Sequence, residues 1–293
     1  MIRRDLLTLL GGAAAAWTLA ARAQQRGLMR RIGVLMSFAA GDPDGQLRIT
    51  GFDKGMRDLG WIEGRNLRTD YRWAPGDSDK LPSQAQELVR IAPEVILANS
   101  TPATLALKAQ GGSVPIVFVQ VTDPVGAGLV ASLARPGGHL TGFTSFEFSI
   151  GSKWLEMLKV VAPHVTRVAM VFSPKTAPFA DLFWGPLEAA APSFDATPIR
   201  VAVGDRAEIE RALDAFAREP NGGLIVLPDV TVINHRADII ALATHHRLPA
   251  IYPFRGFAAS GGLMSYGSDV PTYFGVRPVP VTCRCRHRPS SSW

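Results

Sequence analysis

The fold is decided by residues 31–73, which read RIGVLMSFAAGDPDGQLRITGFDKGMRDLGWIEGRNLRTDYRW. The apolar run at 32–38 predicts a strand, the stretch 46–59 predicts a helix, and 67–73 predicts a second strand. Strand, helix and strand in this order form a β–α–β unit, whose crossover is right-handed in almost all proteins. The stretch therefore indicates an α/β fold built on a parallel sheet.

The same alternation continues along the chain in two series. The first adds strands at 94–99 and 116–121, with helices at 80–91 and 102–109. A turn-rich segment at 137–142 and a helix at 152–161 separate it from the second series. That series predicts strands at 167–172, 198–203, 223–227, 250–253 and 263–266, and helices at 179–190, 206–218 and 233–247. We therefore expect two Rossmann-like lobes with open parallel sheets, an N-terminal lobe at 30–145 and a C-terminal lobe at 146–275.

Length and charge limit the possible functions. The chain has 293 residues, of which 47% are hydrophobic, enough for two cores of ordinary size. The net charge is +6, but the two ends carry seven arginines against one acid. Residues 24–275 hold 24 basic and 24 acidic side chains, so the body has no charge excess to bind nucleic acid.

The first 23 residues, MIRRDLLTLLGGAAAAWTLAARA, have the form of a cleaved signal peptide. Arg3 and Arg4 precede an apolar run, and Ala21-Arg22-Ala23 provides small residues for cleavage. The arginine pair is compatible with either the twin-arginine or the Sec route. We expect a periplasmic protein whose leader is removed.

Motifs for catalysis and metal binding are missing from the sequence. The patterns of serine hydrolases, P-loops, zinc proteases and C-x-x-C redox sites do not occur. The two cysteines, Cys283 and Cys285, lie close together near the end of the chain. We therefore expect no enzyme, no metal and no cofactor.

Polar residues follow several predicted strands, where ligands of open α/β sheets bind. Ser100 and Thr101 also begin a helix, whose N–H groups suit a carboxylate. Asp229 and Asp269 could pair with an amine across a cleft, and Tyr252, Phe254 and Tyr266 could supply an aromatic wall. The candidate ligand-binding residues are Ser37, Ser100, Thr101, Thr122, Asp123, Asp229, Tyr252 and Asp269.

Several segments resemble a known family. Matching motifs lie in the leader and at 31–35, 51–66, 71–74, 115–118, 123–125, 132–138, 141–142 and 262–267. Together they are similar to proteobacterial ABC-transporter substrate-binding proteins, of the tryptophan/tyrosine type, over residues 30–270. The resemblance implies type I periplasmic binding protein architecture. It also implies a receptor that closes two lobes around an amino-acid-like molecule and delivers it to an inner-membrane ABC permease.

One alternative function accompanies this interpretation. A periplasmic sensor with the same two lobes would bind a ligand but signal to a membrane receptor.

The residues 276–293, VRPVPVTCRCRHRPSSSW, depart from the family's helix, charged linker and final strand. Three prolines and four arginines in that segment predict an irregular tail, as a frameshifted reading frame or a natural disordered end would give.

Overall fold

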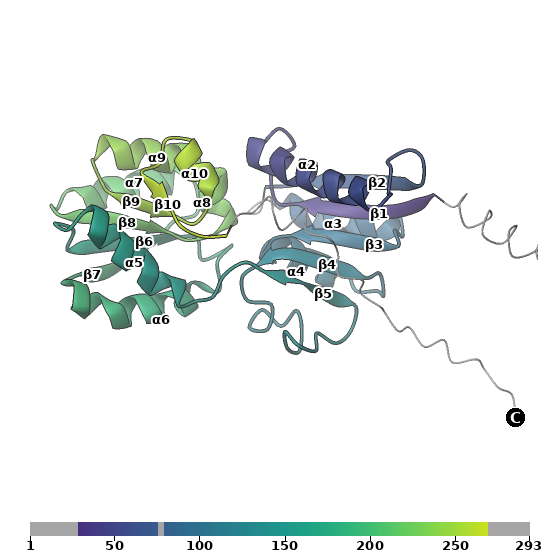
Figure 1. Ribbon diagram of the computed structural model, residues 1–293, viewed down its shortest axis with the longest axis horizontal. Helices are drawn as coiled ribbons and strands as arrows, with labels where there is room; N and C mark the ends of the chain where they lie inside the picture. The colour runs from purple at the N-terminus through teal and green to yellow at the C-terminus, as the bar shows by residue number, and fades with distance from the viewer. Residues whose placement is uncertain (1–28, 76–78, 269–293) are drawn as a thin grey trace, which may run out of the picture.

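The computed structural model describes residues 29–75 and 79–268. They form two α/β lobes that lie side by side, with the purple-to-blue lobe formed first along the chain and the green-to-yellow lobe second (Figure 1). The predicted fold class is confirmed. The predicted signal peptide at 1–23 and the predicted tail at 276–293 lie outside the described residues.

The first lobe contains a five-stranded sheet in the order β2-β1-β3-β4-β5, in which every pairing is parallel. Its strands are β1 (Arg30–Met36), β2 (Leu67–Trp73), β3 (Val95–Asn99), β4 (Ile116–Val121) and β5 (Leu140–Thr144). Its helices are α2 (Pro43–Asp58), α3 (Lys80–Arg90) and α4 (Thr101–Ala109). The helix α3 buries Leu81, Ala85 and Leu88, which form an apolar stripe along one face of the helix.

The second lobe repeats the plan with the strand order β10-β9-β8-β6-β7, again entirely parallel. Its strands are β6 (Arg167–Phe172), β7 (Thr197–Ala202), β8 (Gly222–Val226), β9 (Ala250–Tyr252) and β10 (Met264–Ser265). The helices are α5 (Ile150–Val161), α6 (Ala180–Ala190), η1 (Ala191–Phe194), α7 (Arg206–Ala217), α8 (Val230–Asn234), α9 (Arg236–His245) and α10 (Arg255–Ala259).

Two local predictions need correction. The segment 137–142 was expected to be a turn, but β5 begins at Leu140 and forms the edge of the first sheet. Gly142 weakens the β-strand pattern of this segment. Glycine is nevertheless required at this position, because a Cβ there would lie 2.0 Å from the Phe118 carbonyl oxygen. The single helix expected at 233–247 is instead α8 followed by α9, because the chain bends at His235.

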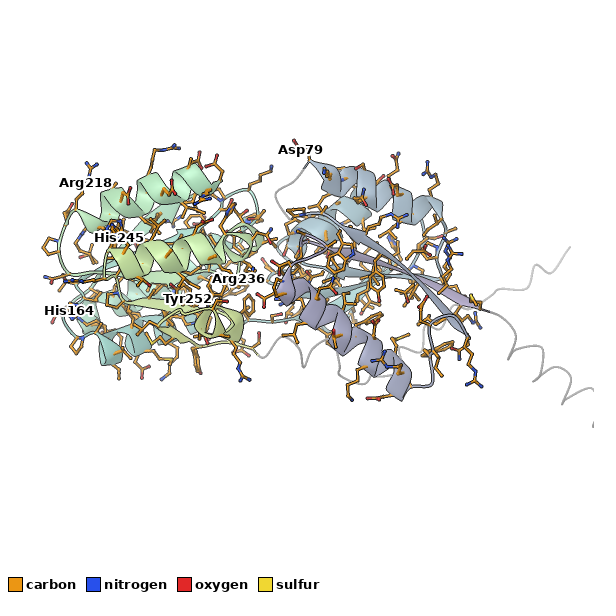
Figure 2. The ribbon with its side chains drawn as sticks, turned by 90° about the horizontal axis from the view of Figure 1, so that it is seen from above. Asp79, His164, Arg218, Arg236, His245 and Tyr252 are labelled. Atoms are coloured by element: carbon orange, nitrogen blue, oxygen red, sulfur yellow. The ribbon has the colours of Figure 1, made fainter. Side chains whose placement is uncertain are left out.

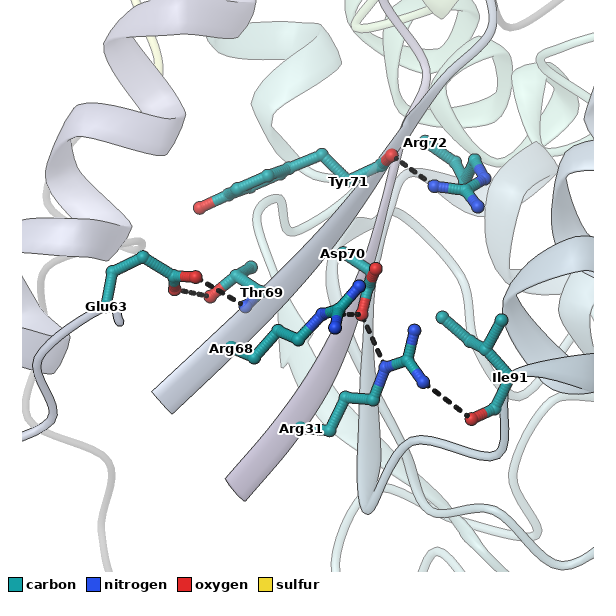
Figure 3. A network of polar contacts seen from close by, with 8 residues as sticks. All are labelled: Arg31, Glu63, Arg68, Thr69, Asp70, Tyr71, Arg72 and Ile91. Atoms are coloured by element: carbon teal, nitrogen blue, oxygen red, sulfur yellow. Dashed lines mark hydrogen bonds and ion pairs between the residues drawn. The ribbon is translucent and has the colours of Figure 1, made fainter. Parts of the chain in front are cut away.

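A polar network ties β1 to β2 at the amino ends of these strands (Figure 3). Asp70 accepts a hydrogen bond from Nε of Arg31 at 2.6 Å, and Nε of Arg68 lies 3.7 Å from the same carboxylate. The Arg31 guanidinium lowers the pKa of Asp70 below its usual value. The network lies opposite the carboxyl ends of the strands, which leaves those ends free to build a site.

The larger apolar core spans both lobes. It consists mainly of second-lobe residues but includes Val34, Met36, Phe38, Ile49 and Val119 of the first. Phe146, which follows β5, packs edge to face on Phe254 with ring centroids 5.5 Å apart. Apolar side chains therefore form part of the contact between the lobes.

Within 29–75 and 79–268, no helix combines the length and apolar character needed to cross a membrane.

Candidate functional site

A small hollow lies where the carboxyl ends of the two sheets approach each other. The first lobe contributes polar residues from the ends of β3 and β4, and the second lobe contributes apolar residues. This central hollow is lined by Phe38, Asn99, Ser100, Gln120, Thr122, Ser145, Phe146, Pro228, Val230, Ile233 and Phe254. It contains about 20 Å³ of space, enough for about one water molecule. A larger ligand therefore requires the lobes to separate.

Two residues of the central hollow have a left-handed backbone. Ser100 has φ of 90°, and Gln120 has φ of 58° at a register shift in the pairing of β4 with β5. Positive φ in a residue other than glycine costs free energy and is concentrated at functional sites. The irregularity turns the Gln120 side chain toward Asn99, whose Nδ2 donates to Gln120 Oε1 at 2.7 Å.

Hydroxyl groups gather at the start of α4. Ser37 Oγ lies 2.6 Å from Ser100 Oγ and 2.9 Å from the Asn99 carbonyl oxygen. Ser100 is the N-cap of α4, and its Oγ accepts from the Ala103 N–H at 3.5 Å. The buried hydroxyls of Thr101 and Ser145 have no hydrogen-bond partner among the described residues. Buried groups of this kind are rarely left unpaired, so they suit a polar ligand.

Two further hollows extend the site along the boundary between the lobes. The side hollow has a volume of about 610 Å³ and lies between α2 and α10. Its lining consists of Pro43, Asp44, Leu47, Arg48, Arg236, Phe254, Arg255, Gly256, Ala259 and Ser260. The far hollow has a volume of about 220 Å³ and includes Thr101 and Asp123 of the first lobe and Phe179 and Asp181 of the second.

Ion pairs between the lobes border the side hollow. Arg236, at the start of α9, lies 3.0 Å from Asp42 and 3.6 Å from Asp44 of the first lobe. Figure 2 shows Arg236 at the side of the second lobe that faces the first. These side chains are largely buried, so loss of one partner would leave a buried charge unpaired in this arrangement of the lobes.

The structure brings some of the predicted site residues together. Ser100 and Thr122 line the central hollow, and Thr101 and Asp123 line the far hollow. Ser37 lies fully buried behind Ser100 and positions it through their hydroxyl contact. The Asp123 carboxylate accepts from the Gly126 N–H at 2.8 Å.

Two further predicted residues line none of the three hollows. Asp229 is fully buried, and its carboxylate accepts from the Ser173 N–H, the Thr176 hydroxyl and the Thr231 N–H. Burial raises its pKa to about 6. Tyr252 lies inside the second lobe (Figure 2), where its ring stacks on Phe257 with centroids 4.8 Å apart. Asp269 lies outside the described residues.

Sequence reasoning missed most of the residues that line these hollows, among them Arg48, Gln120, Ser145 and Phe146. A signal existed for Gln120, which is the single polar residue in the strand sequence IVFVQV. None existed for Arg48, because a charged residue on a helix is usually exposed. Its burial follows from the packing of α2 against the Phe38 ring and the second lobe.

Among residues 29–75 and 79–268, no three His, Cys, Asp or Glu side chains lie close enough together to hold a metal ion.

Similar proteins carry this fold. A tyrosine-binding protein of Clostridioides difficile is 28% identical over 219 residues, which are 75% of this chain but only 62% of that protein. A conserved domain protein of Vibrio cholerae superposes with a TM-score of 0.77 at 26% identity, covering 84% of this chain and 81% of that one. An ABC domain of Streptococcus pneumoniae in complex with L-Trp gives a TM-score of 0.76 at 22% identity, with coverage of 84% and 82%.

A protein-family model also matches most of the two lobes. The model of the ABC transporter substrate binding protein family matches residues 36–276, which include all three hollows and every strand except β1, of which only Met36 is matched. The solved relatives share the type I periplasmic binding protein fold of two parallel-sheet lobes. The chain belongs to the ABC transporter substrate-binding protein family.

Proposed function

We propose that this protein is the solute-binding component of an ABC importer and binds a small, amino-acid-like or related molecule between its lobes. The observation that carries this proposal is the central hollow, where hydroxyl and amide groups of one lobe face apolar residues of the other. A ligand held there touches both lobes, so binding favours the closed arrangement over the open one.

The central and side hollows together provide the space for the ligand. The central hollow alone holds about one water molecule, but the side hollow adds about 610 Å³ beside it, and the two share Phe254. A molecule with a polar and an apolar end fits this arrangement. The names of two relatives, one binding tyrosine and one solved with L-Trp, agree with a ligand of that class.

Closure is the whole of the proposed mechanism. The protein would capture the molecule outside the inner membrane and release it to a permease, with no chemical step. The signal peptide predicted at 1–23 would provide export, and the absence of nucleophile–base motifs in the sequence agrees with a receptor rather than an enzyme.

The test is to identify the bound molecule. The full chain is expressed in a bacterial host, recovered from the periplasm, and denatured, and the released small molecules are identified by mass spectrometry. A stoichiometric ligand that rebinds in calorimetry and reduces the radius of gyration in solution scattering is expected. A chain that reaches the periplasm folded but binds no small molecule would contradict the proposal.

Transport distinguishes an importer from a sensor. Deletion of the gene should abolish uptake of the radiolabelled ligand, and the intact gene should restore it. If uptake is unchanged while a transcriptional response to the ligand is lost, the sensor interpretation is correct instead.

A further inference from the structure

The side hollow contains a buried cation whose partners are all neutral. Arg48 of α2 is only 3% exposed. Its guanidinium lies over the Phe38 ring, 4.6 Å from the centroid. Its Nε donates to Gln120 Oε1 at 2.9 Å, and its Nη1 donates to the Asp44 carbonyl oxygen at 2.7 Å. Removing a charge from water is costly, so buried arginines are normally paired with a carboxylate.

The acids near Arg48 are occupied by another arginine. Asp42 and Asp44 form their ion pairs with Arg236 of the second lobe, at 3.0 and 3.6 Å. Within the part of the chain that the structure describes, no carboxylate oxygen lies within 4.0 Å of the Arg48 guanidinium. Burial lowers the pKa of Arg48 to about 10, although the two acids counteract this effect. The charge is therefore retained at neutral pH but lacks a direct anionic partner.

Arg48 lies at the junction of the two hollows. It lines the side hollow, and it contacts Phe38 and Gln120, which line the central hollow. A ligand whose apolar part lies between Phe38 and Phe254 would carry its polar end to the Arg48 guanidinium. An arginine fork suits a carboxylate, which it can bind through two parallel hydrogen bonds.

In the part of the chain that the structure describes, the residues that line the central hollow offer no acidic partner for an ammonium group of the ligand. No Asp or Glu is among the described residues that line the central hollow, and Asp44, the acid in the lining of the side hollow, is paired with Arg236. Asp229, the expected partner of an amine, already accepts from three donors inside the second lobe. A ligand ammonium placed in the central hollow would lose its water without gaining a carboxylate.

We propose that Arg48 binds the carboxylate of the ligand, and that the ligand is a small organic acid whose recognition does not use an ammonium group. This inference rests on the proposed function, because it assigns the chemistry of the same cleft. It makes Arg48 the residue that distinguishes acids from amines of equal shape.

Two matched series of compounds test the inference on the full-length wild-type protein, freed of bound ligand and titrated in a calorimeter. One series is L-phenylalanine, 3-phenylpropionate and phenethylamine, and the other is L-leucine, 4-methylpentanoate and 3-methylbutylamine. In the series that binds, the acid without an amino group should bind within about threefold of the amino acid. The amine without a carboxylate should bind at least a hundredfold more weakly.

The variant Arg48→Gln should weaken binding of the acid by thirtyfold or more. The matched control is Arg57→Gln, an exposed arginine on the same helix, which should change affinity by less than twofold. Circular dichroism checks that both variants fold. If Arg48→Gln does not fold, the wild-type comparison of acid with amine still decides the question.

The outcomes separate this inference from the proposed function. Equal binding of the acid and the amine, or acid binding that Arg48→Gln leaves unchanged, overturns the role of Arg48 and keeps the solute-binding function. If none of the six compounds binds, the molecule released from the periplasmic protein decides, and one that lacks a carboxylate overturns the inference. If the protein binds no small molecule at all, the proposed function fails and the inference fails with it.

Discussion

Nη1 of Arg236 lies 3.0 Å from Oδ2 of Asp42, which joins residues 194 positions apart and in different lobes. Asp42 also caps α2, since its Oδ1 accepts from the N–H groups of Asp44 and Gly45 at 2.8 and 3.1 Å. One carboxylate thus fixes the start of a first-lobe helix and holds the second lobe. Opening of the cleft must break the interaction with Arg236 while the cap stays intact.

The variant Arg236→Ala should shift the protein toward the open arrangement. The pairs with Asp42 and Asp44 are more than four-fifths buried, but opening hydrates the two acids and recovers part of the loss. We therefore expect a cost of about 1–2 kcal/mol, or roughly a tenfold weaker ligand affinity. Solution scattering should show a larger radius of gyration for the ligand-free variant than for wild type.

The matched control is Arg211→Ala, which removes an exposed arginine from the same lobe. It should alter neither the radius of gyration nor the affinity. An Arg236→Ala protein with wild-type scattering and wild-type affinity would show that the ion pairs do not control closure.

The sequence predicted most of the fold because most strands carry a signal in their own residues. The expected strands at 67–73, 116–121 and 167–172 have the bounds of β2, β4 and β6. The polar start of α4 was also visible, since Ser100 and Thr101 precede an apolar helix. Such features depend on neighbours along the chain.

The cleft could be predicted only in part, because burial there arises between lobes. Arg48 and Arg236 resemble surface charges in the sequence, and only the packing of α2 against the second lobe encloses them. Tyr252 was expected to face the ligand because it ends a strand. In the structure it packs on Phe257 instead, whereas Phe254, which was expected in the same aromatic wall, does line the hollow. Side-chain direction at a strand end depends on the following turn, which the periodicity does not encode.

Asp229 offers a test of stability rather than of binding. In Asp229→Ala the donors at Ser173, Thr176 and Thr231 lose their acceptor inside the second lobe. Unpaired buried donors destabilise proteins, so the free energy of unfolding should fall by about 2–3 kcal/mol. Chemical denaturation measures this loss, and a variant with wild-type stability but no ligand binding would instead favour a direct ligand role for Asp229.

The same carboxyl predicts a pH dependence. Burial raises the pKa of Asp229 to about 6 from an ordinary value of 3.8, so between these pH values the folded state binds more protons than the unfolded state. Its contribution to stability is therefore complete below about pH 4 and declines as the pH rises through 6. The stability difference between wild type and Asp229→Ala should accordingly be larger at pH 4 than at pH 7. A difference that grows with pH would contradict the raised pKa.

Ser100 allows backbone strain to be measured apart from its hydroxyl. With φ of 90° and ψ of 163°, it occupies a region that glycine adopts easily and other residues rarely do. Ser100→Ala and Ser100→Gly both lose the contact with Ser37, but only the glycine variant relieves the strain. Ser100→Gly should therefore be more stable than Ser100→Ala by about 1 kcal/mol in chemical denaturation. Equal stabilities would show that the conformation costs little.

Gln120→Glu places the missing negative charge beside Arg48. Gln120 Oε1 accepts from Arg48 Nε at 2.9 Å and from Asn99 Nδ2 at 2.7 Å, and a glutamate oxygen can accept both of these bonds. A buried arginine next to a carboxylate gains a charge-assisted hydrogen bond, so the melting temperature should rise by a few degrees. The new carboxylate competes for the group that a ligand acid needs, so affinity for 3-phenylpropionate should fall by tenfold or more while stability increases. A mutation that merely disturbs the cleft would lower both the melting temperature and the affinity. A higher melting temperature with a lower affinity would therefore show that the new carboxylate binds Arg48 in place of the ligand acid.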